Sequence, residues 1–122
     1  MTCEVVLYSY PACTTCKKAL KWLRENQIEY RLVDITQSPP SKEILIKAIE
    51  QLGSRKSLFN TSGLSYRALG SKVVRAMNDV EAIEALISDG KLIKRPFLIT
   101  GKGKILVGFK TEFWAEALLL SD

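Results

Sequence analysis

The sequence contains no histidine at all. Histidine is the usual base beside a catalytic cysteine or serine and a common metal ligand, so its absence excludes Cys/His dyads, histidine-ligated metals and a histidine general base. Long apolar runs are absent too, because runs such as residues 97–99 and 117–120 fall far short of the roughly 20 residues that span a bilayer. Any chemistry must therefore rely on thiols and cations, and we expect no membrane association.

Cysteine is scarce, with three copies, but two of them, Cys13 and Cys16, form a Cys-x-x-Cys pair. The N-terminus lacks a basic stretch followed by a signal-type apolar core, so we expect a cytoplasmic protein. In that reducing compartment a close pair is typical of catalysis, redox sensing or metal binding rather than of a structural disulfide. A zinc site needs about four ligands, so one pair without histidine predicts no metal. Cys3 is expected to be a small buried residue of a strand.

The chain has 122 residues and a net charge of +5. This length suits one domain, here residues 1–122, which buries its own core without disulfide or metal staples. Lysine and arginine are scattered among acids, and the aromatic residues fall on apolar faces. The basic charge therefore does not predict direct nucleic-acid binding.

The cysteine pair lies where an apolar strand, residues 3–8, gives way to an amphipathic helix that begins at Thr14. A helix N-terminus offers unpaired backbone N–H groups and a partial positive charge, both of which stabilise a thiolate. Helical spacing places Cys16 on the apolar face, opposite the basic residues Lys17, Lys18, Lys21 and Arg24. We therefore expect Cys13 to face solvent and attack, and Cys16 to point inward and resolve the adduct.

The remaining pattern predicts an α/β fold. A second strand at residues 30–34 completes a β-α-β unit, and two apolar runs at 97–100 and 104–107 predict a hairpin with glycines at positive φ. Between them lies a helical insertion, about residues 41–90, in which Ser41 caps the first helix and Gly53 ends it. Further expectations are a capping box at 78–81, an apolar helix face of Val80, Ile83, Leu86 and Ile87, and a last helix capped by Thr111 that packs through Phe113, Trp114, Ala117, Leu118 and Leu120.

Several short motifs follow one another along the chain. They are Tyr10-Pro-Ala-Cys13-Thr-Thr-Cys16-Lys-Lys-Ala19, Pro39-Pro-Ser-Lys-Glu43, Asn60-Thr-Ser-Gly63, Ser88-Asp-Gly-Lys-Leu-Ile-Lys-Arg-Pro96 and Val107-Gly-Phe-Lys110. In this order and spacing they resemble the motifs of the arsenate reductase (ArsC)/Spx family over essentially the whole chain. The resemblance implies a thioredoxin-like fold: a small mixed sheet flanked by helices, with the helical insertion between the β-α-β start and the C-terminal hairpin and helix.

The resemblance also implies roles. Cys13 would be the nucleophile, and Arg95 would bind an oxyanion or stabilise the thiolate. The Arg95–Pro96 bond would be cis and lie against the cysteine loop, with Pro96 structural at the site. No bound cofactor is implied; an external thiol reductant, glutathione with glutaredoxin or thioredoxin, would restore the thiols.

The sequence also departs from the family. Single-cysteine arsenate reductases use three arginines around the anion, whereas the matching regions here read Ser57-Leu-Phe-Asn60 and Leu106-Val-Gly-Phe109, which leaves Arg95. Asn60 is a candidate substrate contact, or otherwise a turn or helix cap. The cysteine pair resembles that of Spx. Two functions follow: a thiol oxidoreductase acting on arsenate, another small oxyanion or a disulfide, or an Spx-like redox-sensing regulator that binds RNA polymerase.

Overall fold

The computed structural model describes residues 4–120, which places Cys3 outside the described residues. The chain divides into two compact units. We call the first the sheet unit (Met1–Asp34 with Arg95–Asp122) and the second the helical unit (Ile35–Lys94). Each is described by itself.

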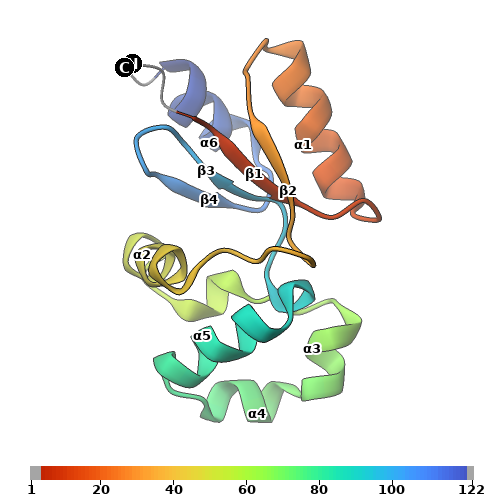
Figure 1. Ribbon diagram of the computed structural model, residues 1–122, viewed down its shortest axis with the longest axis vertical. Helices are drawn as coiled ribbons and strands as arrows, with labels where there is room; N and C mark the ends of the chain where they lie inside the picture. Colours follow the sequence, from red (N-terminus) through yellow and green to blue (C-terminus); the bar gives the residue numbers. More distant parts are fainter. Residues whose placement is uncertain (1–3, 121–122) are drawn as a thin grey trace. The chain divides into compact units, whose positions relative to one another are not determined.

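The sheet unit contains a four-stranded mixed sheet in the order β2-β1-β3-β4 (Figure 1). Helix α1 (Thr14–Glu25) joins β1 (Val6–Ser9) to β2 (Arg31–Asp34), and these strands are parallel, so the predicted β-α-β unit is confirmed. Strands β3 (Phe97–Ile99) and β4 (Ile105–Val107) form the predicted hairpin, with β3 antiparallel to β1. The Cys-x-x-Cys sequence therefore lies just after the end of a central strand, β1.

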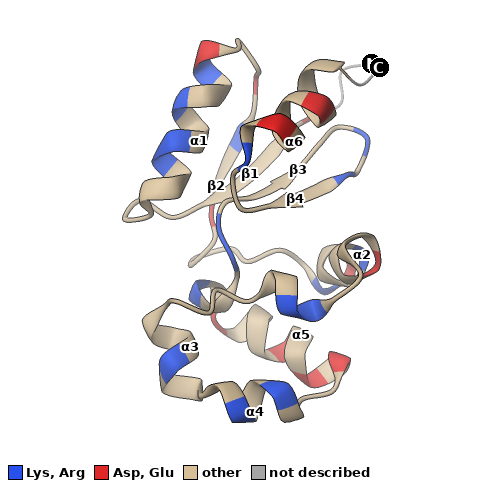
Figure 2. Ribbon diagram, turned by 180° about the vertical axis from the view of Figure 1, so that it is seen from behind, with Lys and Arg blue, Asp and Glu red and all other residues tan. Residues whose placement is uncertain are grey.

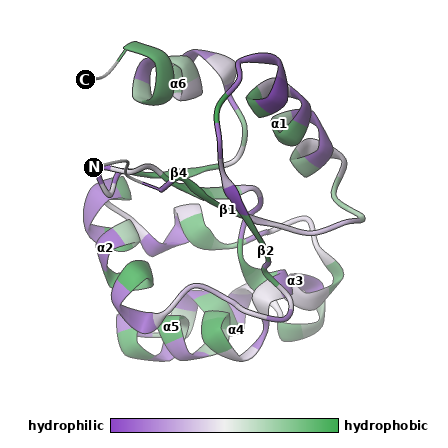
Figure 3. Ribbon diagram, turned by 45° about the horizontal axis from the view of Figure 1, so that its top comes forward, coloured by the Kyte–Doolittle hydropathy of each residue, from purple (hydrophilic) through white to green (hydrophobic). Residues whose placement is uncertain are grey.

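Helix α1 and the C-terminal helix α6 (Thr111–Ala115) pack on one face of this sheet (Figure 3). The side chains of Leu7 and Leu98 lie on neighbouring strands and are fully buried. They form one cluster with Ala19 and Leu23 of α1 and Trp114 of α6. Burying each large apolar side chain contributes roughly 1.5–3 kcal/mol, so this cluster fixes α1 on the sheet.

The end of the chain differs from the prediction. Lys110, not Thr111, occupies the N-cap position of α6, and no side chain caps it. The helix then widens into a π-helical segment, η3 (Glu116–Leu120). The wider turn breaks the 3.6-residue period after Ala115, and Leu120, which was predicted to pack, is 77% exposed. Phe113, also predicted to pack, lies before the wider turn and is 53% exposed, while its neighbour Trp114 is the buried residue of α6. In the hairpin, the loop glycine with positive φ is Gly103, at 87°.

The helical unit contains the predicted helical insertion, and the predicted caps are confirmed. Ser41 Oγ accepts the N–H of Ile44, and Gly53 is left-handed with φ 78°. Asn78 and Glu81 form the capping box, with bonds of 2.8 and 3.0 Å. The elements are α2 (Lys42–Leu52), η1 (Arg55–Leu58), α3 (Leu64–Leu69), α4 (Ser71–Ala76), α5 (Asp79–Ser88) and η2 (Gly90–Leu92).

The apolar face predicted for α5 is partly wrong. Val80 and Ile87 are 63% and 39% exposed, and the buried residues are Ala82, Ile83 and Leu86. These three residues keep helical spacing, but the buried face of α5 is rotated toward Ala82. The prediction missed Ala82 because it was based on large apolar residues and alanine is small. In residues 4–120, no helix is both long enough and apolar enough to cross a membrane.

Gly90 lies against the backbone of Ile35 and Thr36 in the helical unit. A Cβ added there would lie 1.9 Å from the carbonyl oxygen of Ile35, whereas a Cβ at Gly53 would meet nothing within 4 Å. We predict that Gly90→Ala destabilises the protein by about 3 kcal/mol or more, because backbone must move to admit the methyl group. Gly53→Ala, the matched control, should cost about 1 kcal/mol through its positive φ. Urea unfolding measures both, and equal losses would contradict the packing described here.

Candidate active site

Cys13 is the N-cap of α1, directly after the turn that follows β1. The turn is closed by the Cys13 N–H, which donates to the Tyr10 carbonyl at 2.9 Å. The Cys13 Sγ in turn accepts the backbone N–H of Cys16 at 3.2 Å. This is the position of an N-capping oxygen, with sulfur in its place. The thiol is partly exposed and lies at the positive end of a helix, where negative charge on sulfur is stabilised.

Cys16 lies one helical turn further on and is fully buried. Both thiols are free rather than joined as a disulfide. Burial raises the pKa of Cys16 to about 11, and the hydrogen bond with Cys13 adds to the rise, while contacts with the Tyr10 backbone and the Ser9 side chain oppose it. Cys16 therefore stays protonated at neutral pH, with its thiol beside the Cys13 sulfur. The predicted inward position of Cys16 is confirmed.

Arg95 belongs to the same unit and is half-buried. Its guanidinium carbon lies 5.2 Å from the centre of the Tyr10 ring, within the range of a cation–π contact. The Arg95–Pro96 peptide bond is cis, as the family resemblance implied, and Pro96 is buried. Tyr10 thus connects the arginine to the loop: its ring lies against Arg95 and its carbonyl accepts from Cys13.

Asn60 belongs to the helical unit, not to the unit that holds the two thiols. Its N–H donates to the Leu92 carbonyl at 2.8 Å, and its Oδ1 accepts from the hydroxyl of Ser62 at 3.2 Å. Its own carbonyl accepts the N–H of Gly63 at 3.3 Å. These contacts fit the turn role that the sequence left open for Asn60.

The sequence reasoning missed two residues, Ser9 and Tyr10. Ser9 ends β1, is 6% exposed, and its side chain contacts the Cys16 thiol. Tyr10 accepts the backbone N–H of Cys13 through its carbonyl, contacts the Cys16 thiol through its backbone, and contacts Arg95 through its ring. The position of Ser9 in the sequence could have predicted its role, because a hydroxyl at the end of a buried strand, directly before a Cys-x-x-Cys turn, faces the start of the helix.

The arrangement supports thiol chemistry more readily than metal binding. Among residues 4–120, no group of three or more cysteine, aspartate or glutamate side chains is placed to hold a metal ion. The basic residues of α1 lie along the helix that begins at the site (Figure 2). They are Lys17, Lys18, Lys21 and Arg24, all exposed. A partly exposed sulfur at a helix start, beside a protonated thiol and in a loop whose Tyr10 ring contacts Arg95, is suited to attack on an oxidised atom.

Comparison with known proteins finds relatives named as regulators and as reductases. The model of the ArsC family matches residues 8–117. The chain is 45% identical to the uncharacterized protein YusI of Bacillus subtilis, over 93% of this chain and 97% of the relative. It is 28% identical to the global transcriptional regulator Spx of Lactiplantibacillus plantarum, over 88% and 81%. It is also 28% identical to the arsenate reductase of Acidiphilium multivorum, over 82% and 71%.

Solved structures show the same likeness. A putative ArsC family related protein from Bacteroides fragilis is 43% identical, with a TM-score of 0.84 over 93% of this chain and 97% of that one. A possible arsenate reductase from Streptococcus mutans is 40% identical, with a TM-score of 0.82 over 90% and 94%. A glutaredoxin from Archaeoglobus fulgidus, 17% identical with a TM-score of 0.50 over 97% and 88%, shares the fold alone. The predicted thioredoxin-like fold is confirmed.

The two thiols should differ sharply in their reaction with iodoacetamide. We predict that a Cys3→Ser/Cys13→Ser protein, which keeps Cys16, reacts at least 100-fold more slowly at pH 7 than a Cys3→Ser/Cys16→Ser protein, which keeps Cys13. A thiol of pKa about 11 is only about 0.01% ionised at pH 7, and Cys16 is also buried. Its rate should rise about tenfold per pH unit toward pH 11. In denaturing urea the two rates should converge; a Cys16 rate that levels off below pH 9 in the folded protein would contradict the assignment.

Proposed function

Because the chain belongs to the ArsC family, we propose that it is a thiol-dependent oxidoreductase that uses Cys13 as nucleophile and Cys16 as resolving thiol. The observation that carries the proposal is the position of the Cys13 sulfur, which caps α1 and accepts the Cys16 N–H at 3.2 Å. The similarity to an arsenate reductase supports the reaction class. The proposal covers arsenate and disulfides as oxidised substrates.

In the first step the Cys13 thiolate attacks the oxidised atom. With a disulfide substrate a new S–S bond forms to Cys13, the substrate's own S–S bond breaks, and one substrate thiolate leaves. With arsenate an S–As bond forms and an oxygen leaves as water after protonation. The backbone N–H of Cys16 and the positive end of α1 stabilise the attacking charge.

In the second step the Cys16 sulfur attacks the Cys13 sulfur. The Cys13–Cys16 disulfide forms, the bond between Cys13 and the substrate breaks, and the substrate leaves with two more electrons. Cys16 must lose its proton, and burial opposes this by raising its pKa to about 11. The leaving thiolate or arsenic(III) oxyanion accepts that proton. An external thiol reductant, glutathione with glutaredoxin or thioredoxin, then returns two electrons and two protons to the pair.

Arg95 is the cation we assign to the substrate anion. It is held over Tyr10, whose carbonyl closes the cysteine turn, so its charge is fixed beside the loop that carries the nucleophile. A charge-assisted hydrogen bond to an oxyanion contributes roughly 1.5–3 kcal/mol. With one such cation, the site should bind small anions only weakly. Binding of an uncharged disulfide should not depend on Arg95.

A second candidate function is an Spx-like redox switch that binds RNA polymerase. The observation in its favour is the similarity to Spx together with a free Cys13–Cys16 pair able to change oxidation state. A pull-down of purified RNA polymerase by the oxidised and the reduced protein separates the two functions. A switch should retain polymerase in one state only, and a reductase in neither.

The cysteine variants should separate attack from resolution. With arsenate or an organic disulfide and either reductant, we predict that Cys13→Ser abolishes turnover, because the remaining thiol of the pair, Cys16, is buried and stays protonated at neutral pH. Cys16→Ser should still attack once and then accumulate a covalent adduct on Cys13, visible by intact-mass spectrometry. Turnover that survives Cys13→Ser would refute the proposal.

Removing the cation should affect an anionic substrate and spare a neutral one. We predict that Arg95→Ala lowers kcat/KM for arsenate by about 10- to 150-fold, the equivalent of 1.5–3 kcal/mol, with little change for an uncharged disulfide. Arg24→Ala, on the exposed face of α1, is the control and should change either value less than twofold. Equal losses on both substrates would assign Arg95 to structure instead of anion binding.

A further inference from the structure

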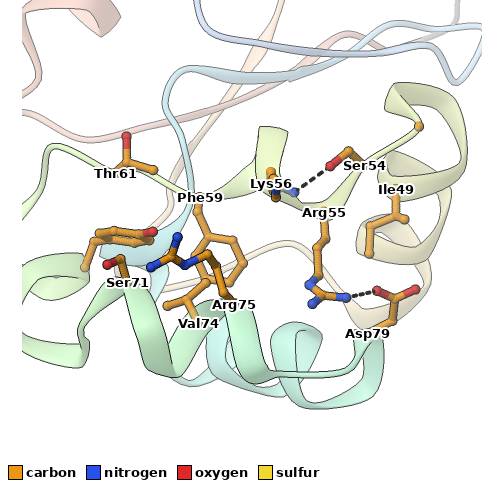
Figure 4. Close-up of a pocket in the computed structure, with 12 residues that line it drawn as sticks. Ile49, Ser54, Arg55, Lys56, Phe59, Thr61, Ser71, Val74, Arg75 and Asp79 are labelled. Carbon is orange, nitrogen blue, oxygen red and sulfur yellow. Dashed lines mark hydrogen bonds and ion pairs between the residues drawn. The ribbon is translucent and has the colours of Figure 1, made fainter.

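The helical unit contains a pocket of about 770 Å³ that thiol chemistry does not use. This volume lies within the range of small-molecule sites. It is shaped by the end of α2, by η1 and by the short helices α3 and α4 (Figure 4). The lining residues that carry the argument are Arg55, Lys56, Phe59, Tyr66, Val74 and Arg75.

The floor of the pocket is apolar and partly aromatic. Phe59 is 4% exposed and Val74 is 7% exposed. The ring of Tyr66 meets that of Phe59 edge-on, with centroids 6.1 Å apart and planes at 64°. Two rings at this angle present both a face and an edge, which suits contact with a further planar ring.

The charged residues of the lining are predominantly cationic. Arg55 is already occupied, because its Nη1 donates to Asp79 Oδ1 at 2.7 Å and its Nη2 donates to the Met77 carbonyl. Lys56 and Arg75 are exposed, and neither makes an ion pair within the part of the chain that the structure describes, residues 4–120. Three cations and one carboxylate leave the pocket with an excess of two positive charges.

We propose that this pocket binds a small organic anion that carries an aromatic ring. The ring lies on the floor formed by Phe59, Tyr66 and Val74, and the anionic group lies between Lys56 and Arg75. The hydroxyls of Thr61 and Ser71, also in the lining, supply further donors. The two halves of the lining indicate this ligand only when taken together. An apolar floor alone would not require unpaired cations beside it, and exposed cations alone would not require a concave aromatic floor. The site is independent of Cys13 and Cys16.

The experiment uses two dyes that differ in charge. 8-Anilinonaphthalene-1-sulfonate is an aromatic sulfonate, and N-phenyl-1-naphthylamine is the same ring system without the sulfonate. Fluorescence titration of the full chain should show saturable binding of the sulfonate dye. Arg75→Gln should raise its Kd at least fivefold, because the anion loses a cation. The neutral dye should bind both proteins with Kd values within twofold of each other.

Two control variants make the result decisive. Arg67→Gln removes an exposed arginine of α3 that does not line the pocket, and it should leave the Kd of the sulfonate dye within twofold. Ser71→Trp fills the pocket from an exposed lining position and should weaken both dyes at least fivefold. Circular dichroism and urea midpoints check that each variant is folded.

Three results would overturn the proposal. These are no saturable binding of the sulfonate dye, equal effects of Arg75→Gln and Arg67→Gln, or binding of either dye that Ser71→Trp does not weaken. Binding that survives Ser71→Trp would place the dye on another apolar surface.

Discussion

The contact between the backbone N–H of Cys16 and the sulfur of Cys13, at 3.2 Å, is the constraint on which the proposed chemistry depends. It makes a thiol the cap of α1 and directs an otherwise unsatisfied helix donor at the atom that would attack. The same helical turn carries Cys16 into the interior, where burial raises its pKa to about 11. This local geometry therefore gives the two cysteine side chains different environments and different reactivity.

That geometry in turn depends on packing some distance away. The helix start is fixed because Ala19 and Leu23 of α1 lie against Leu7 and Leu98 of the sheet. Strand β1 is hydrogen-bonded to β2 on one side and β3 on the other, so its end, and the turn that follows, cannot shift without breaking ladders on both sides. Arg95 reaches the same loop because it lies two residues before β3, which pairs with β1.

Much of the fold could be predicted from the sequence, because it is encoded by local signals whose meaning does not depend on distant residues. These signals are the alternating strand and helix periods, the caps at Ser41 and Gly53, and the capping box at Asn78. Predictions failed where long-range packing decides. The buried stripe of α5 follows Ala82, and the last helix widens into a π-helical segment after Ala115. The contact of the Tyr10 ring with Arg95 was missed because Arg95 lies far along the chain. The pocket in the helical unit is likewise assembled from side chains that are separated in sequence.

The central claim is that Cys13 and Cys16 form a reversible two-electron couple. Its most direct test is equilibration of the protein in glutathione buffers of graded potential, followed by acid quench, alkylation and peptide mapping. The account predicts a single two-electron transition that produces the Cys13–Cys16 disulfide, with a midpoint in the range of about −180 to −270 mV that thioredoxins, glutaredoxins and protein disulfide isomerases occupy. A pair that stays reduced at about −180 mV, or a disulfide that instead involves Cys3, would contradict it.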